Sequence, residues 1–243
     1  MGWSLSMVVI QNATQAQDEV RFIEDIGYSG VKLAENSHFN AACYPKTNSV
    51  YLGILNGNLI ITAPDIAFEN LNDSGNPILA ALESKYPGNE IASFHLQSSV
   101  NGYGFIIRKS GETIRERWGD FEIHMEEIGE PLKEEEEYYQ KVKYDADSGL
   151  IEGIDDEDEI LDFEELVSEI GSRYFEKPMM ENDALWDLEM KQYTYESSPL
   201  DMSYYPNEDL KEEGKEEKSF ISRYWWVFVL AYVIVKVIVR SSR

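Results

Sequence analysis

The chain has 243 residues, of which 43% are hydrophobic, and its 21 Lys and Arg against 46 Asp and Glu give a net charge of −25. A field this negative repels phosphate groups, which argues against direct binding of nucleic acid and favours a basic protein partner. Cys43 is the single cysteine, which excludes an intrachain disulfide.

The charge is unevenly placed along the chain. Residues 1–120 carry 8 bases and 13 acids, residues 121–220 carry 9 and 33, and residues 221–243 carry four bases and no acids. The ordinary interpretation of such an acidic stretch is a solvated surface that keeps the protein in solution. The alternative is a surface that attracts a positively charged partner.

The first third of the chain predicts short elements. Residues 1–10 are apolar and β-branched, which favours a strand. Residues 18–26 place apolar side chains at helical spacing, with acids in the first turn and Gly27 as a stop. Residues 30–33 favour a short strand, followed by a polar loop that runs to Asn48.

The middle third carries the clearest signals of a sheet. In residues 50–63, Asn56-Gly57 lies between two apolar runs and predicts a type I′ hairpin. Asn76 and Pro77 predict the start of a helix that ends at Lys85.

Three further strands follow in sequence. Residues 91–97, 102–109 and 112–118 are separated by turn residues and predict a meander, to which residues 121–125 add a candidate edge strand. Apolar and polar side chains alternate in residues 91–97, so we expect one apolar face. The resulting fold class is α+β, mainly an antiparallel sheet with a few helices on one face.

The second half is acidic and predicts helices. We expect helices at residues 134–142, after a capping box at residues 162–165, and at residues 182–190, with an acidic loop at residues 154–160. Residues 197–218 are polar and predict a flexible tether. The expected domains are residues 1–196, an acidic α+β domain; residues 197–219, a charged tether; and residues 220–240, a transmembrane anchor.

The tail is the most apolar stretch. Residues 224–239 hold one charge, Lys236, and as a helix would span about 24 Å, whereas extension to Phe220 reaches the ~30 Å of a hydrocarbon layer. Trp225 and Trp226 suit the lipid–water boundary, and Lys236 and Arg240 can reach headgroups. We therefore predict an anchor that contacts the bilayer through these four residues. The alternatives are a buried strand or core helix and a segment that lies on the membrane surface.

The two ends together predict a location. The N-terminus lacks the basic region and long apolar core of a signal peptide. A spanning tail then predicts a single-pass, tail-anchored membrane protein whose N-terminal domain is cytoplasmic. Residues 1–6 also fit the loose Met-Gly-x-x-x-Ser lipidation pattern.

The order of residues 50–63, residues 94–118 and Ile128-Gly-Glu-Pro-Leu132 resembles a family of bacterial proteins known as a domain of unknown function. The resemblance covers about residues 45–190 and leaves out the tether and the tail. Because that family has no established activity, the resemblance implies no catalytic residue and no cofactor.

Motifs for chemistry are weak. His38, His95 and His124 are far apart and show no zinc-ligand spacing, although His124 with the two glutamates that follow could form half of an acid–base site. Asp145-Ala-Asp147 begins like a calcium loop but lacks the glycine at its sixth position. We therefore assign no catalytic, cofactor-binding or metal residue.

Three shorter patterns have simpler interpretations than a functional site. The acidic run 155–159 is typical of a solvated loop, and the pair Gly102 and Gly104 lacks the third glycine of a phosphate-binding turn. The serines Ser98 and Ser99 lack a nucleophile elbow. Arg108, Arg115 and Arg117 form the densest positive cluster. If they share one face of the sheet without acids, an anion could bind there; otherwise they form a salt-bridged strand surface.

The hypothesis that best fits these patterns is a membrane-tethered cytoplasmic interaction module. A narrower version is an immunity-like or inhibitory role toward a basic partner. The competing hypothesis is a hydrolase that uses clustered carboxylates, which requires a deep cleft with an acid facing His124.

Overall fold

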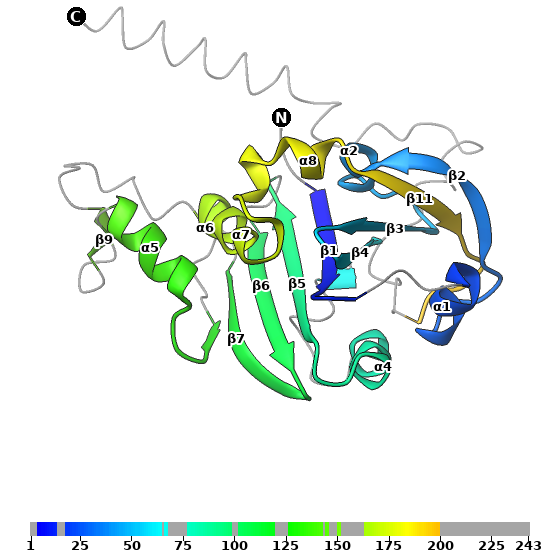
Figure 1. Ribbon diagram of the computed structural model, residues 1–243, viewed down its shortest axis with the longest axis horizontal. Coiled ribbons are helices and arrows are strands. Elements are labelled where there is room, and N and C mark those ends of the chain that lie inside the picture. Colours follow the sequence, from blue (N-terminus) through cyan, green and yellow to red (C-terminus); the bar gives the residue numbers. More distant parts are fainter. Residues whose placement is uncertain are drawn as a thin grey trace, which may run out of the picture. The chain divides into compact units, whose positions relative to one another are not determined.

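The computed structural model describes residues 4–13, 18–64, 66–67, 77–98, 102–119, 126–142, 144–145, 150–151 and 163–199. All of them lie in the first of the two units into which the chain divides, Met1–Asp201. Nine strands form one antiparallel sheet in the order β2-β11-β3-β4-β1-β5-β6-β7-β8 (Figure 1). The strands are β1 Ser4–Ile10, β2 Lys32–His38, β3 Ser49–Leu55, β4 Asn58–Thr62, β5 Glu90–Gln97, β6 Gly102–Lys109, β7 Glu112–Gly119, β8 Glu126–Ile128 and β11 Glu189–Thr194, with β9 Tyr144–Asp145 and β10 Leu150–Ile151 as a separate pair. The helices are α1 Glu19–Asp25, α2 Phe39–Ala42, α4 Pro77–Lys85, α5 Lys133–Val142, α6 Phe163–Ile170, α7 Ser172–Phe175, α8 Asp183–Trp186 and the short 3-10 helix η1 Met179–Glu181.

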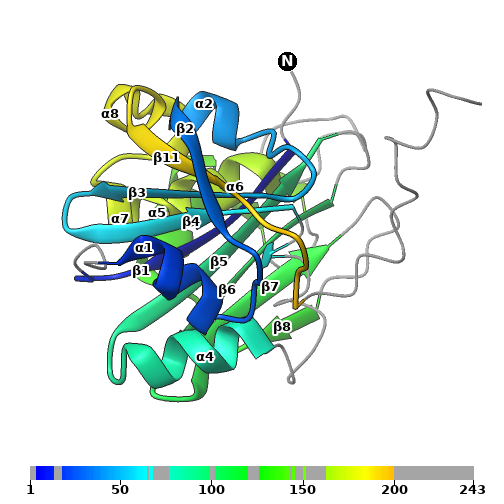
Figure 2. The ribbon, with the colours of Figure 1, turned by 90° about the vertical axis from the view of Figure 1, so that its right-hand side faces the viewer.

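Helices cover both faces of the sheet. Met7 and Val9 of β1 belong to the main core, together with side chains from α2, α5, α6, α7 and α8. Val8 and Ile10 point the opposite way and are equally buried, because successive side chains of a strand alternate between faces. On that second face lie α1 and α4 (Figure 2). The class is therefore α+β, with a large antiparallel sheet between two helical layers.

The prediction of helices on one face only is wrong. The residues of β5 from Glu90 to Leu96 are all buried, although their polarity alternates. Ser93 and His95 of β5 lie on the second face, which α1 and α4 cover (Figure 2), and Glu90 lies on the main-core face, where Arg173 and Tyr174 of α7 bind it. Both are long-range packing events that alternation within one strand does not reveal. A strand covered on both faces is expected to contain a continuous apolar run, and Met7–Ile10 is such a run.

The hairpin and the meander are confirmed. Asn56 and Gly57 have φ of 52° and 75°, the two positive angles of a type I′ turn between β3 and β4. β5, β6 and β7 pair as successive antiparallel neighbours, and Ser110 and Gly111 form the second turn with φ of 54° and 81°.

Two segments have a secondary structure different from the predicted one. The predicted helix at 182–190 ends at Trp186, and the chain continues as β11, which inserts between β2 and β3. The loop predicted up to Asn48 contains most of β2 and all of α2. Both errors have one cause: β2 and β11 are polar strands whose structure comes from pairing with each other across more than 150 residues.

The helices predicted in the second half are present, and several other predicted segments lie outside the described residues. Helices occur at α5 and α6 as expected, and buried residues of α6 include Leu166, Val167 and Ile170. Among the described residues, no helix combines the length and apolarity needed to cross a bilayer. The anchor residues Trp225, Trp226, Lys236 and Arg240, most of the tether, the candidate edge strand 121–125 and the acidic loop 154–160 lie outside the described residues.

Candidate functional site

A buried cluster of charges joins α5 to the outer strands of the sheet. The side chain of Arg115 on β7 is 1% exposed and that of Glu135 on α5 is 0% exposed. Arg115 donates from Nε to Oε1 of Glu135 at 2.7 Å and from Nη2 to Oε2 at 2.8 Å. Its Nη1 donates to the backbone oxygen of Gly129 at 2.8 Å. This two-pronged geometry is the strongest form of a carboxylate–guanidinium contact.

The cluster is balanced in charge. Arg117 contacts Glu135 at 3.4 Å and Glu127 of β8 at 2.8 Å, and Arg115 also reaches Glu127 at 3.2 Å. The cluster thus contains two arginines and two glutamates. Burial alone would lower the pKa of Arg115, but its hydrogen bonds and charge interactions with Glu135 and Glu127 outweigh burial and raise it.

Aromatic rings complete the surroundings of Arg117. The guanidinium carbon lies 5.2 Å from the ring centre of Phe163 and 5.7 Å from that of Tyr139, which are cation–π distances. The predicted cluster of three arginines is therefore divided. Arg115 and Arg117 share the main-core face with acids against them, whereas Arg108 lies on the opposite face and donates to Glu83 of α4 at 2.7 Å. A shared anion site is excluded, and the salt-bridged alternative holds.

Glu135 is a central residue that the sequence analysis missed. It stands within a run of four glutamates, which suggests a solvated helix face. Its spacing gave a signal nonetheless, because it lies three residues after Leu132 and three before Tyr138, which are both buried. Residues three apart share one side of a helix. The backbone N–H of Leu132 also donates to Glu135 at 3.0 Å, which satisfies a free donor at the helix start.

A second network ties α7 to β5. Arg173 donates two hydrogen bonds to Glu90, at 2.7 and 3.1 Å, and contacts Glu134 at 3.3 Å, while the Tyr174 hydroxyl donates to Glu90 at 2.8 Å. Burial alone would raise the pKa of Glu90, but the hydrogen bonds from Arg173 and Tyr174 lower it. Burial and the Glu90 charge raise the pKa of Tyr174.

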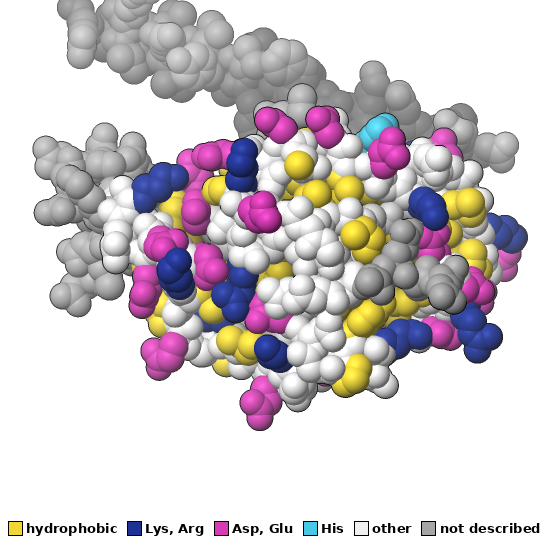
Figure 3. Space-filling model, viewed as in Figure 1, with side chains coloured by type: hydrophobic (Ala, Val, Ile, Leu, Met, Phe, Trp, Pro, Cys, Tyr) yellow, Lys and Arg dark blue, Asp and Glu magenta, His cyan; other side chains and the backbone are white. Residues whose placement is uncertain are grey.

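The outer surface above these networks is acidic. We call residues 133–142 and 163–189, which include α5 to α8, the acidic helix layer. It holds twelve acids and four bases; without Glu135, which is buried and bound to Arg115, eleven acids remain, an excess of seven negative charges. Figure 3 shows carboxylates at many places across this face, with Lys and Arg side chains between them.

A small groove lies within the acidic helix layer. It encloses about 60 Å³ between α5, α6 and η1. Its lining residues are Tyr138, Lys141, Glu165, Ser168, Glu169, Pro178, Met180 and Glu181. Burial raises the pKa of Glu169; the charge of Lys141 opposes this shift, and the charges of Glu181, Glu137 and Glu165 add to it. The groove is therefore a place of negative potential with an apolar wall.

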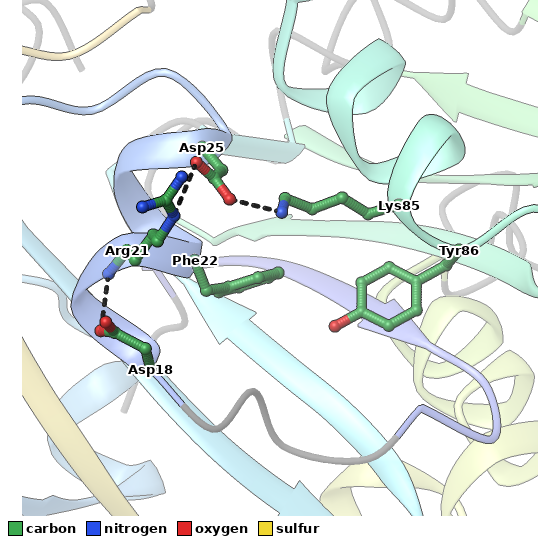
Figure 4. A pocket seen from close by; sticks show the side chains of 6 residues that line it. All are labelled: Asp18, Arg21, Phe22, Asp25, Lys85 and Tyr86. Atoms are coloured by element: carbon green, nitrogen blue, oxygen red, sulfur yellow. Dashed lines mark hydrogen bonds and ion pairs between the residues drawn. The ribbon is translucent and has the colours of Figure 1, made fainter.

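An open hollow of about 260 Å³ lies on the other face, between α1 and α4 (Figure 4). Its floor is formed by Phe22 and Tyr86, whose ring centres are 6.3 Å apart. At its rim, Lys85 donates to Asp25 at 2.7 Å, and Arg21 approaches the same carboxylate at 4.0 Å. The Lys85 hydrogen bond lowers the pKa of Asp25. Both cations are thus turned toward an acid of the chain itself.

The single residues flagged in the sequence do not converge. His95 is buried on β5, and burial lowers its pKa to about 4. His38 is exposed at the end of β2, and Cys43 is buried after α2, where burial raises the thiol pKa to about 12. Ser98 donates to Glu164 at 3.4 Å. Residues 99, 124, 147 and 155–159 lie outside the described residues.

No group of three or more His, Cys, Asp or Glu side chains within the described ranges is arranged to hold a metal ion. No protein-family model, curated protein or solved structure matches the chain. What the chain does must therefore be argued from its own chemistry.

Proposed function

We propose that the chain is a membrane-tethered interaction module whose acidic helix layer binds a basic protein partner, while residues 220–240 hold it at a bilayer. The observation that carries the proposal is the excess of seven negative charges that remains in the acidic helix layer when the buried, paired Glu135 is left out. A surface of one sign attracts a partner of the opposite sign and accelerates the encounter.

Two of the four bases of the acidic helix layer are paired with acids of the chain itself. Arg173 is bound to Glu90 and Glu134, and its side chain is 29% exposed. Lys133 pairs with Glu137. Other acids of the layer, such as Glu176, Glu181 and Asp187, are exposed. The excess of exposed carboxylates supports a partner rich in Lys and Arg and disfavours nucleic acid.

The membrane part rests on the tail sequence. Trp225 and Trp226 on one side and Lys236 and Arg240 on the other are typical of residues at the two ends of a spanning helix. A cytoplasmic domain at a membrane that binds a basic protein suits an immunity-like or inhibitory role, in which the acidic surface covers a basic toxin or enzyme. The hydrolase alternative requires an acid facing His124, which lies outside the described residues. The groove and the hollow are both below the ~300 Å³ of typical ligand pockets, and neither is lined by a histidine.

The partner-binding half is tested with a labelled oligolysine peptide and full-length protein. In one variant, Glu165, Glu169 and Glu181 are changed to Gln. In the control variant, the exposed residues Glu24, Glu112 and Glu130 are changed to Gln, which removes the same charge from outside the acidic helix layer. Exposed ion pairs are worth about 0.2–1 kcal/mol each, so we expect the first variant to bind about threefold to a hundredfold more weakly than the control. Equal affinities would show that the layer is not the binding surface.

Salt provides a second check on the same complex. Binding should weaken as the salt concentration rises toward ~0.5 M, because the screening length there is only a few ångströms. Salt-independent binding would count against attraction by charge.

The membrane half is tested by fractionation. The full-length protein should remain in the membrane fraction after a high-pH wash, and a version that ends at Lys218 should be soluble. If both are soluble, the anchor hypothesis fails, whereas the oligolysine result stands on its own.

A further inference from the structure

The end strand β2 is almost entirely exposed. It lies at the end of the sheet and pairs with β11 on one side (Figure 1). On its other side, no strand from the described ranges pairs with it. Six of its seven side chains are exposed and the seventh, Ser37, is half-buried. Leu33 is 57% exposed.

Such a strand gains little from burial. Ordering a strand costs backbone entropy, which apolar contacts normally offset. Within the described ranges β2 pairs with β11 alone, so its outer edge offers backbone N–H and C=O groups to which no other described strand is paired. An edge of this length is a template for an added strand.

The charges on β2 are placed in a self-complementary way. The register shifts between Gln192 and Tyr193, so that β2 carries one extra residue, a bulge at Ala34. Lys32 stands opposite Thr194 and Glu35 opposite Gln192, two positions that share a face of β11. The bulge therefore brings Lys32 and Glu35 to the same face of β2.

Their present partners are weak. Lys32 contacts Glu196 at 3.2 Å with side chains 72% and 71% exposed, and Glu35 contacts Lys46 at 3.3 Å with side chains 62% and 68% exposed. These four residues sum to zero charge. The β2 edge thus lacks the negative field of the acidic helix layer, so local charge does not oppose the approach of a second acidic chain.

We propose that β2 binds β2 of a second copy of this chain, antiparallel and about a two-fold axis between Leu33 and Ala34. In this register Lys32 of each copy lies opposite Glu35 of the other, and Leu33 lies beside Ala34 of the second copy. Each new ion pair joins the two existing ones into an alternating row of four charges, Lys46, Glu35, and Lys32 and Glu196 of the second copy. One patch that fits itself is what a two-fold dimer requires.

The bulge and the charges of β2 also disfavour pairing with other strands. Both are devices that discourage pairing with an arbitrary strand. Across a two-fold axis the charges of Lys32 and Glu35 match, so a second copy does not meet the charge obstacle. The opposite edge is a poorer candidate, because β8 has three residues and its Glu127 is bound to Arg115 and Arg117.

Charge exchange tests the proposal with full-length protein in a non-ionic detergent, by sedimentation over a range of concentrations. Lys32→Glu places two acids opposite each other at both symmetric positions, and Glu35→Lys places two bases there. Opposite charges directly across strands stabilise and like charges destabilise, so each variant should dimerise about tenfold or more weakly than the wild type. An equimolar mixture of the two variants restores both attractive pairs and should form a heterodimer with about wild-type affinity.

The mixture separates the proposal from simple damage to the fold. Both side chains are more than 60% exposed, and circular dichroism checks that each variant is folded. A wild-type protein that stays monomeric at all accessible concentrations overturns the proposal. So do single variants that dimerise like the wild type, which would place the contact elsewhere, or a mixture that fails to associate. The outcome is independent of oligolysine binding, which uses the acidic helix layer.

Discussion

Removal of one partner from the Arg115–Glu135 pair should destabilise the protein strongly. The side chains are 1% and 0% exposed, so water cannot replace a lost partner. Glu135→Leu leaves Arg115 and Arg117 with Glu127 as their remaining acid within the cluster, and the Glu127 side chain is 43% exposed. Breaking a buried pair in this way costs about 3–5 kcal/mol. For a chain of this size, that loss corresponds to a fall in melting temperature of roughly 6–20 °C.

Urea denaturation of four proteins measures the effect: wild type, Glu135→Leu, Arg115→Met and the double variant. Because two apolar residues of similar volume replace a buried pair at little cost, we expect the double variant to lose no more stability than either single variant. Glu137→Gln serves as the matched control, since its pair with Lys133 lies on the outside of the same helix. Its unfolding midpoint should not move.

A free energy of unfolding for Glu135→Leu within about 1 kcal/mol of the wild-type value, the range of exposed ion pairs, would refute a strong contribution from the buried pair. This contribution is also refuted if the losses of the two single variants simply add in the double variant, because residues in contact are expected to be coupled.

Three further predictions concern single residues. The pKa of His95 falls to about 4 in the fold against about 6.5 when unfolded, so the unfolded state takes up the proton first as the pH falls. In urea titrations, the stability difference between wild type and His95→Gln should be constant above pH 6.5 and shift against the wild type by up to about 3 kcal/mol by pH 4. A difference that does not change with pH contradicts this. The Cys43 thiol, whose pKa burial raises to about 12, should react with a thiol reagent only after urea unfolds the protein, and fast labelling of the native state would disprove its burial. Gly104→Ala should destabilise by about 1–3 kcal/mol, because the added Cβ would lie 2.4 Å from Cβ of Trp118, whereas Gly57→Ala meets open space and carries only the strain of its positive φ, about 1 kcal/mol; equal melting temperatures would refute the steric argument.

The parts of the fold that local chemistry determines could be predicted from the sequence. Asn56-Gly57 demands two positive φ angles and so places the β3–β4 hairpin. Asp18 accepts the backbone N–H of Arg21 and begins α1 where the acids of the first turn indicate. These signals lie within a few residues of the structure that they specify.

The parts that distant pairing determines could not be predicted. β11 has the sequence Glu-Met-Lys-Gln-Tyr-Thr, in which Met190 and Tyr193 face opposite sides of the sheet, so neither strand alternation nor a helical stripe is evident. Its place follows from pairing with β3 and β2, more than 135 residues away. Arg115 and Arg117 could be picked out as a basic cluster, but their main partner Glu135 lies on another element and looks like its exposed neighbours.

The buried cluster and the acidic helix layer are physically linked. Glu135 fixes α5 to β7 from the inner side, and the outer side of the same helix presents Glu136 and Glu137. Stability and surface charge can therefore be separated by substitution. In the double variant Arg115→Met, Glu135→Leu, α5 still packs against the sheet through apolar side chains and still presents its outer acids. Its affinity for oligolysine should therefore match that of the wild type, even though the buried ion pair is gone. A loss of affinity in that variant would mean that the interior charges, rather than the outer carboxylates, create the field that the proposed partner meets.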